Sequence, residues 1–337
     1  MLKLVFIGFG NVGRSLAQIL IDKKKLLKER YGSEFKVVGI GELYGSFVNK
    51  EGLNLEDLVD LSFSDFENHK NWKKGLTAPE LIKNLDFDVL VEMSYTNLED
   101  GEPGLTYIRE ALKNGHHIVS SNKGPFVFAF QELQDLAREG ELELKYEATV
   151  GGAIPIFNLG MYGLASNEIF SIRAILNGTS NFILTKMSTE KIPFEIALKE
   201  AQELGYAEAD PTLDIEGHDA AAKLVILANT FLGSNVSFKN VKIQGIKDIV
   251  PDAIALASED DFLIKHIAIA DKKGNLEVAP KLVPFDSPFA IGGTNNIIVL
   301  ETDLAKHISI IGHGAGGSEA ASAIMSDLVS ISIKEKK

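Results

Sequence analysis

The first forty residues combine short apolar runs with one helical pattern. A run rich in β-branched and aromatic residues, "KLVFIGFG", is followed by Leu16, Ile19 and Leu20 at helical spacing. After a charged stretch, a second apolar run, "FKVVGIGE", ends at residue 42. This order predicts a strand, a long helix and a second strand.

Two more apolar runs follow, over residues 87–97 and 116–126, and each ends in polar residues. A helical pattern at 104–115 lies between them. Alternating strands and helices predict a parallel sheet, whose ligands bind at the carboxyl ends of the strands. Lys123, followed by Gly-Pro, is therefore interpreted as a cleft residue, the alternative being an ordinary surface lysine. The polar residues expected at this edge are Ser94, Tyr95, Thr96, Asn122 and Lys123.

The second half of the chain is less regular. Its pattern predicts an α+β unit with a mixed or antiparallel sheet. A glycine pair at 151–152 favours a boundary near residue 150, which gives a first domain over 1–150 and a second over 151–312. The last helical pattern, 313–330, is expected to pack back on the first domain. The strand-like segments are 168–178, 262–271, 276–283 and 296–303, and the helical ones are 193–205 and 217–233.

Composition narrows the function. The 337 residues are 45% hydrophobic, which suffices for two domains, and no apolar run approaches the ~20 residues that span a bilayer. We therefore expect a cytoplasmic protein without a membrane partner. The absence of cysteine excludes disulfides and thiol nucleophiles. A net charge of −13 argues against nucleic acid as a partner, and the seven histidines show no zinc-type spacing.

The first glycine cluster has the spacing of a dinucleotide-binding loop. Gly8 allows a tight turn, Gly10 allows a pyrophosphate to approach the backbone, and Gly13 allows close helix–strand packing. The phosphates would lie at the helix N-terminus, beside Asn11 and Val12. The alternative is a chance glycine turn, and the flanking strand and helix favour the dinucleotide site.

Glu42 ends the second strand, where a carboxylate can accept hydrogen bonds from ribose hydroxyls and would repel a 2′-phosphate. This favours NAD over NADP, although an exposed loop acid is the alternative. A second glycine-rich turn, around Gly314, could contact the cofactor again or could simply begin a helix.

A single lysine, Lys223, follows an acidic run and enters an apolar segment. Asp219 lies four residues before it, so the two share a helix face, and the surrounding alanines, leucines and isoleucines indicate a helix buried on all sides. A lysine in such a place can act as a general base, and the spare acids can bind a substrate ammonium. The alternative is a solvated charged face. The acids of the run are Glu208, Asp210, Asp214, Glu216 and Asp219.

These motifs resemble those of homoserine dehydrogenases, in family order and across nearly the whole chain. The segments are the Gly-loop, "SSNKGP", "YEATVGGAIP", "LNGTSNFIL", "ELGYAEADPTLDIEGHDAAAKL" and "GHGAGGSEAASAIMSDL". The resemblance implies a Rossmann-type domain with a second catalytic and dimerisation domain, in a homodimer. It implies interconversion of L-homoserine and L-aspartate 4-semialdehyde with NAD or NADP. Because longer members append a regulatory module, it also implies that this chain is insensitive to threonine.

The resemblance also implies residue roles. Lys223 and Lys123 match the catalytic lysines, and Asp219 matches a partner that positions Lys223. Glu208 and Asp214 match the residues that hold the substrate. Gly178 and Thr179, with Tyr206, match substrate-binding positions, and a Na⁺ or K⁺ site is implied at Glu147 and the carbonyls of Val150, Gly152 and Ile154.

Two alternative functions fit the sequence less well. Aspartate-semialdehyde dehydrogenase needs a cysteine for its thioester, and this chain has none. A non-enzymatic dinucleotide-sensing regulator would keep the Gly-loop, but it gives no reason for two cleft lysines near carboxylates.

Overall fold

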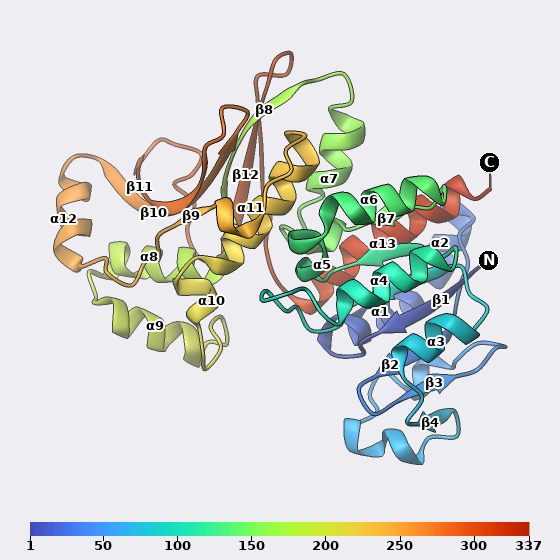
Figure 1. Cartoon of the computed structure of the whole chain (residues 1–337). Coiled ribbons are helices and arrows are strands. Elements are labelled where there is room, and N and C mark those ends of the chain that lie inside the picture. Colours follow the sequence, from blue (N-terminus) through green and yellow to red (C-terminus); the bar gives the residue numbers. More distant parts are fainter. Residues whose placement is uncertain (337) are drawn as a thin grey trace. The chain divides into compact units, whose positions relative to one another are not determined.

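The computed structural model describes residues 1–336 in two compact units. Unit 1 is Met1–Thr149 with Gly316–Lys337, and unit 2 is Val150–Ala315. Each unit has its own sheet (Figure 1). Within residues 1–336, no helix has the length and apolar character needed to cross a bilayer.

Unit 1 contains a seven-stranded sheet in the order β4-β3-β2-β1-β5-β6-β7, in which β1, β2, β5, β6 and β7 run parallel. The chain passes from β1 to β2 on one side and later to β5 on the other, so the strand order reverses at β1. Ligands bind at such a reversal in open α/β sheets. The strands are β1 Leu2–Ile7, β2 Phe35–Glu42, β3 Gly45–Val48, β4 Trp72–Lys74, β5 Val89–Glu92, β6 His117–Ser120 and β7 Leu144–Lys145.

Helices cover both faces of this sheet (Figure 1). The central strands are apolar on both faces because of this cover, as in "VLVE" of β5, which is buried throughout. The helices of unit 1 are α1 Asn11–Asp22, α2 Lys24–Tyr31, α3 Ala78–Asn84, α4 Gly104–Lys113, α5 Lys123–Phe128, α6 Phe130–Glu139 and α13 Gly317–Lys334.

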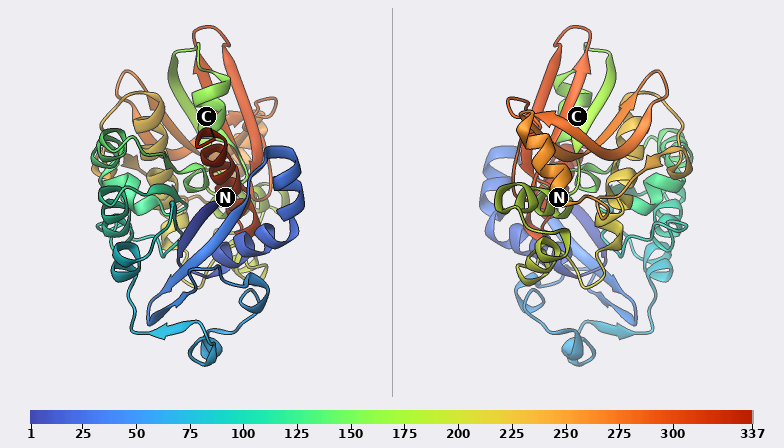
Figure 2. Two further views of the ribbon diagram at one scale, coloured as in Figure 1. Left: turned by 90° about the vertical axis from the view of Figure 1, so that its right-hand side faces the viewer. Right: turned by 90° about the vertical axis from the view of Figure 1, so that its left-hand side faces the viewer.

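The C-terminal helix α13 is part of the core of unit 1. Its Ala321, Ile324 and Leu328 are fully buried and belong to one apolar cluster with Leu16 of α1 and Phe6 of β1. The left view of Figure 2 shows this helix, in dark red, beside the blue N-terminal strands, and α13 packs on α1. The first and last segments of the chain therefore share one core.

Unit 2 contains a six-stranded sheet in the order β13-β12-β8-β10-β11-β9, antiparallel except for the β11–β9 pair. The predicted class, a Rossmann-type α/β unit with a second α+β unit, is confirmed. The strands are β8 Ile169–Ile175, β9 Lys242–Ile243, β10 Phe262–Asp271, β11 Leu276–Pro284, β12 Asn295–Thr302 and β13 His307–His313.

Two elements of unit 2 differ from the sequence expectation. The strand predicted over 168–178 ends at Ile175, and Gly178 begins the long helix α8. Residues 307–313, partly assigned to a glycine turn, form strand β13. The helices are α7 Ile156–Asn158, α8 Gly178–Glu190, α9 Phe194–Glu203, α10 Thr212–Ile215, α11 His218–Phe231 and α12 Pro251–Glu259.

Candidate active site

Two of the three glycines after β1 lie where only glycine fits. Gly8 has a φ of +92°, and a Cβ there would lie 2.6 Å from the carbonyl oxygen of Met93, just beyond β5. A Cβ on Gly13 would lie 2.7 Å from the Gly8 oxygen. At Gly10, by contrast, a Cβ would meet nothing within 4 Å, so the backbone at the start of α1 is open to a ligand. This geometry suits a phosphate at the helix N-terminus.

Glu42, the last residue of β2, accepts a hydrogen bond from the backbone N–H of Phe9 in this loop. Burial raises the pKa of Glu42, and the N–H groups of Phe9 and Leu43 oppose that rise. Nearby, Arg14 donates to the carbonyls of Val59 (2.6 Å) and Leu61 (2.7 Å). Its guanidinium is therefore already bound by backbone oxygens.

A buried carboxylate organises the carboxyl ends of β5 and β6. Glu92, fully buried, accepts hydrogen bonds from the N–H and hydroxyl of Ser94, and from Ser120 at 3.2 Å. Burial raises its pKa, and these donors oppose the rise. Asn122 donates to the Tyr95 oxygen (3.2 Å) and caps α5, whose first residue is Lys123. The structure thus brings Ser94, Asn122 and Lys123 to one edge of the sheet, with Thr96 on the loop that follows β5.

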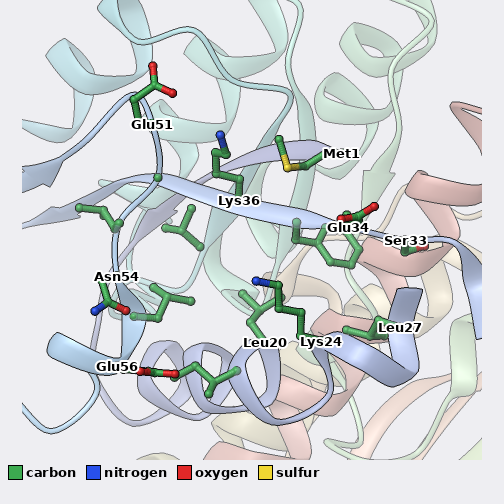
Figure 3. Close-up of a pocket in the computed structure, with 16 residues that line it drawn as sticks. Met1, Leu20, Lys24, Leu27, Ser33, Glu34, Lys36, Glu51, Asn54 and Glu56 are labelled. Atoms are coloured by element: carbon green, nitrogen blue, oxygen red, sulfur yellow. The ribbon is translucent and has the colours of Figure 1, made fainter. Parts of the chain in front are cut away.

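A separate hollow of about 340 Å³ lies at the other end of the sheet (Figure 3). It is lined by the start of β2, including Lys36, by Leu20 and Lys24 near the end of α1, and by the loop with Glu51 and Asn54. Because it borders the amino end of β2, it is distinct from the edge formed by the glycine loop.

In unit 2, Lys223 is buried in α11, where ten successive residues from Ala220 to Asn229 are buried. Its Nζ lies 2.6 Å from Asp219 Oδ2 and donates to the Leu176 oxygen at 2.7 Å. An ammonium has three N–H groups. Two of them have acceptors within residues 1–336, Asp219 and the Leu176 oxygen.

Asn177, which was not among the residues predicted from the sequence, links the acids to α8. Its Nδ2 lies 2.6 Å from Asp214 Oδ1 and 3.0 Å from Asp219 Oδ2, while its Oδ1 accepts the Ser180 N–H and caps α8. Burial and then the Asp219 charge raise the pKa of Asp214, whereas Asn177 and Lys223 oppose this. An asparagine just before Gly-Thr-Ser is a helix N-cap signal that could have revealed it.

Other predicted substrate residues lie at the edge of this cluster. Thr179 donates to the Tyr206 oxygen at 2.7 Å, and the Tyr206 side chain is half exposed. Gly178 begins α8, where a Cβ would lie 2.8 Å from the Thr294 oxygen. Glu208 is exposed, and its backbone oxygen accepts from Gln202. The structure therefore joins Asp214, Asp219 and Lys223, and leaves the Glu208 side chain in solvent.

The remaining predicted residues fall in different units. Gly314 packs against Asn296 in unit 2, where a Cβ would lie 2.2 Å from that side chain. Of the residues implied for a monovalent cation, Glu147 lies in unit 1 and is 2% exposed. The backbone of Val150, Gly152 and Ile154 lies in unit 2. Within residues 1–336, no group of three or more metal-binding His, Asp or Glu side chains is present.

A parallel sheet with an open glycine loop at its point of reversal, in a chain that also has a buried lysine–carboxylate cluster, defines a nicotinamide-dependent dehydrogenase. The homoserine dehydrogenase family model matches residues 155–329. The homoserine dehydrogenase of Methanocaldococcus jannaschii is 47% identical over 99% of both chains. The NAD(+)-dependent homoserine dehydrogenase of Pseudomonas canavaninivorans is 37% identical over 98% of this chain and 96% of its own.

A crystal structure of a putative homoserine dehydrogenase from Archaeoglobus fulgidus has a TM-score of 0.90 and 44% identity, covering 98% of this chain and 99% of that one. The chain belongs to the homoserine dehydrogenase family. It is an oxidoreductase of amino-acid biosynthesis that uses NAD or NADP. The alternative of a non-enzymatic sensor is therefore not supported.

Proposed function

We propose that the cluster of Asp214, Asp219 and Lys223 in unit 2 is the substrate site. The main support is that Asn177 contacts both Asp214 and Asp219, and that Asp219 lies beside Lys223. Two carboxylates with one lysine leave a net negative charge that suits the ammonium of homoserine. In its ammonium form, Lys223 has a third N–H that suits the side-chain oxygen of the substrate in the reductive direction. Glu208, on the exposed loop of the same acidic run, is proposed as a second contact for the ammonium.

The reaction needs a hydride acceptor and a proton acceptor. Bound NAD(P)⁺ supplies the hydride acceptor. We assign the proton on the side-chain oxygen to Lys223 or Lys123: in the oxidative direction one of these lysines, in its neutral form, takes the hydroxyl proton, and in the reductive direction it returns a proton to the oxygen. Asp219 fixes the position of Lys223 through the contact at 2.6 Å.

We assign the dinucleotide to the glycine loop: Gly8, Gly10, Asn11, Val12 and Gly13 for the pyrophosphate and Glu42 for the ribose, with Ser94 and Thr96 along the same edge. Glu42 supports NAD as the preferred cofactor because its carboxylate would repel a 2′-phosphate. Gly314 remains a predicted second contact. The Na⁺ or K⁺ site implied by the resemblance for Glu147 and the carbonyls of Val150, Gly152 and Ile154, all of them oxygen ligands, stays a prediction.

A homodimer and a cytoplasmic location also stay proposals. In support of a dimer, β13 is an edge strand of unit 2 on which Ile311 is 53% exposed, and exposed apolar edges favour pairing with another chain.

The substrate assignment is tested with 4-hydroxybutyrate, which is homoserine without the ammonium. We expect the wild-type protein to prefer homoserine by at least about 10²-fold in kcat/KM, and Asp214→Asn to reduce this ratio roughly tenfold or more. If Asp214→Asn leaves the ratio unchanged, the cluster does not bind the ammonium.

A further inference from the structure

Lys265, on β10, is a second buried lysine of unit 2, and its acceptors among residues 1–336 are all uncharged. Its side chain is 3% exposed, and its Nζ donates to Asn181 Oδ1 (2.9 Å), Thr185 Oγ1 (3.1 Å) and the Ile291 oxygen (2.6 Å). Three acceptors match the three N–H groups of an ammonium, whereas a neutral amine has only two. Burial alone lowers the pKa of Lys265 to about 8, so it is mostly charged at neutral pH.

The acceptors of Lys265 connect two segments. Asn181 and Thr185 lie one turn apart on α8, and Ile291 lies on the loop between β11 and β12. The loop and the first residue of β12 make further contacts with α8. Asn181 Nδ2 donates to the Asn295 oxygen at 3.1 Å, and a Cβ on Gly292 would lie 3.2 Å from Thr185. The Lys265 ammonium therefore connects this loop to α8 through three hydrogen bonds.

The first turn of α8 also carries the substrate cluster. Asn177, its N-cap, contacts Asp214 and Asp219, and Thr179 contacts the Tyr206 backbone. Gly178, between them, packs against the Thr294 oxygen of the loop. A shift of the loop relative to α8 would thus move the residues that hold the acids in place.

We infer that Lys265 is a positioning residue for the substrate site: its ammonium locks the loop around residues 291–295 to the first two turns of α8, and so fixes Asn177 and Thr179. This rests on the proposed function. Lys265 has no direct part in the chemistry, because its three hydrogens are all used within the protein.

The test compares Lys265→Met, which keeps the length of the side chain and removes the ammonium, with Lys281→Met on β11 as the control. Lys281 is partly exposed and pairs with Glu277. We expect Lys265→Met to raise the KM for homoserine about tenfold, with the KM for the nucleotide and kcat within about twofold, and Lys281→Met to change none of them.

A pH profile separates positioning from a merely structural role. In the wild-type protein the KM for homoserine should rise above about pH 8, as Lys265 loses its third donor, and this rise should be absent in Lys265→Met. If Lys265→Met does not fold, Thr185→Val is used in its place, because it removes one acceptor of the ammonium at nearly constant volume. Thr185→Val should raise the KM for homoserine about threefold.

A lower melting temperature with the KM for homoserine within twofold of the parent, in whichever variant folds, would overturn the inference. The substrate assignment fails separately: it is judged by the effect of Asp214→Asn on discrimination against 4-hydroxybutyrate, in protein with Lys265 intact.

Discussion

Lys223 Nζ donates a hydrogen bond to the backbone oxygen of Leu176, 2.7 Å away. Leu176 comes directly before the N-cap of α8, so the lysine of α11 is bound both to its own helix, through Asp219, and to the start of another. A buried ion pair does not by itself indicate catalysis, because breaking any such pair is destabilising. Kinetic measurements on variants distinguish a catalytic role of the Lys223–Asp219 pair from a structural one.

Replacing Lys223 by methionine should remove a proposed proton-transfer group and keep the helix, because methionine is a good helix former of similar length. We expect kcat to fall by roughly 10²- to 10⁴-fold, the usual range for lost acid–base catalysis. Binding of NAD, measured by fluorescence titration, should be unchanged. Lys199→Met, an exposed lysine on α9, is the control. A lower melting temperature with kcat within threefold of the parent would show that the pair is only structural.

Asn177→Asp should disturb the acids and keep the helix cap. Aspartate still accepts the Ser180 N–H, but it cannot donate to Asp214 and it adds a negative charge. Burial and Asp219 already raise the pKa of Asp214, and the loss of the Asn177 donor should raise it further. Because Asp214 becomes protonated as pH falls through this pKa, the acid limb of kcat/KM should move to higher pH. The KM for homoserine should rise about tenfold, a loss of ~1.4 kcal/mol.

The matched control for this asparagine is Asn240→Asp. Asn240 is exposed and serves as acceptor in the cap of a short 3-10 helix. An unchanged acid limb in Asn177→Asp, equal to that of the control, would mean that Asp214 does not have to be ionised for substrate binding.

Glu42→Ala should reduce the preference for NAD over NADP. The carboxylate accepts the Phe9 N–H and, if it binds the ribose as proposed, would repel a 2′-phosphate. We expect the ratio of kcat/KM for NAD to that for NADP to fall about tenfold or more. Glu34→Ala, at the opposite end of the same strand, should leave the ratio unchanged. Wild-type protein that already favours NADP would contradict the assignment.

His266 should make unit 2 sensitive to acid. Its Nε2–H donates to the Gln244 oxygen at 2.9 Å, and burial lowers its pKa to about 4. Between about pH 6.5 and 4 the unfolded chain binds more protons at this residue, so the free energy of unfolding falls as pH falls, by up to roughly 3 kcal/mol. Urea unfolding at pH 7 and 4.5 should show a smaller fall in His266→Gln.

His307→Gln, at an exposed site on β13, should behave like the parent protein in that comparison. An equal loss of stability in the parent and His266→Gln would assign the acid sensitivity to other groups.

Ile311→Lys should weaken self-association if the exposed edge strand β13 forms a dimer interface, because a lysine on an edge opposes pairing. Light scattering after size-exclusion chromatography should then give about half the mass of the parent at the same concentration. A monomeric parent, or an unchanged dimer in the variant, would refute this interface.

The sequence predicted the elements with strong local signals. The Gly-loop with its strand and helix, the buried helix around Lys223 and the main strands of unit 2 all carry a clear hydrophobic period. Helix α8 carries none: seven of its residues from Thr179 to Met187 are buried, and it begins with Gly-Thr-Ser-Asn, which are weak helix formers. Its N-cap Asn177 was missed for the same reason.

Other features depend on partners that are distant in sequence. Strand β13 was partly missed because its polar and apolar side chains do not follow a clear strand period. Its extended form depends on pairing with β12. The short strands β3 and β4 likewise form by pairing at the end of the sheet. Lys265 gave no local signal at all, because its acceptors lie 84, 80 and 26 residues away.

The place of α13 in the core of unit 1 affects how the protein is made. A ribosome synthesises residues 1–149 first, but the apolar surface that Ala321, Ile324 and Leu328 cover stays exposed until all of unit 2 has been translated. During that interval unit 2 can fold as an insertion while the core of unit 1 is still incomplete. Nascent chains arrested before residue 316 should therefore bind chaperones or be degraded, because the apolar surface of unit 1 is exposed. Synthesis of α13 should cover that surface.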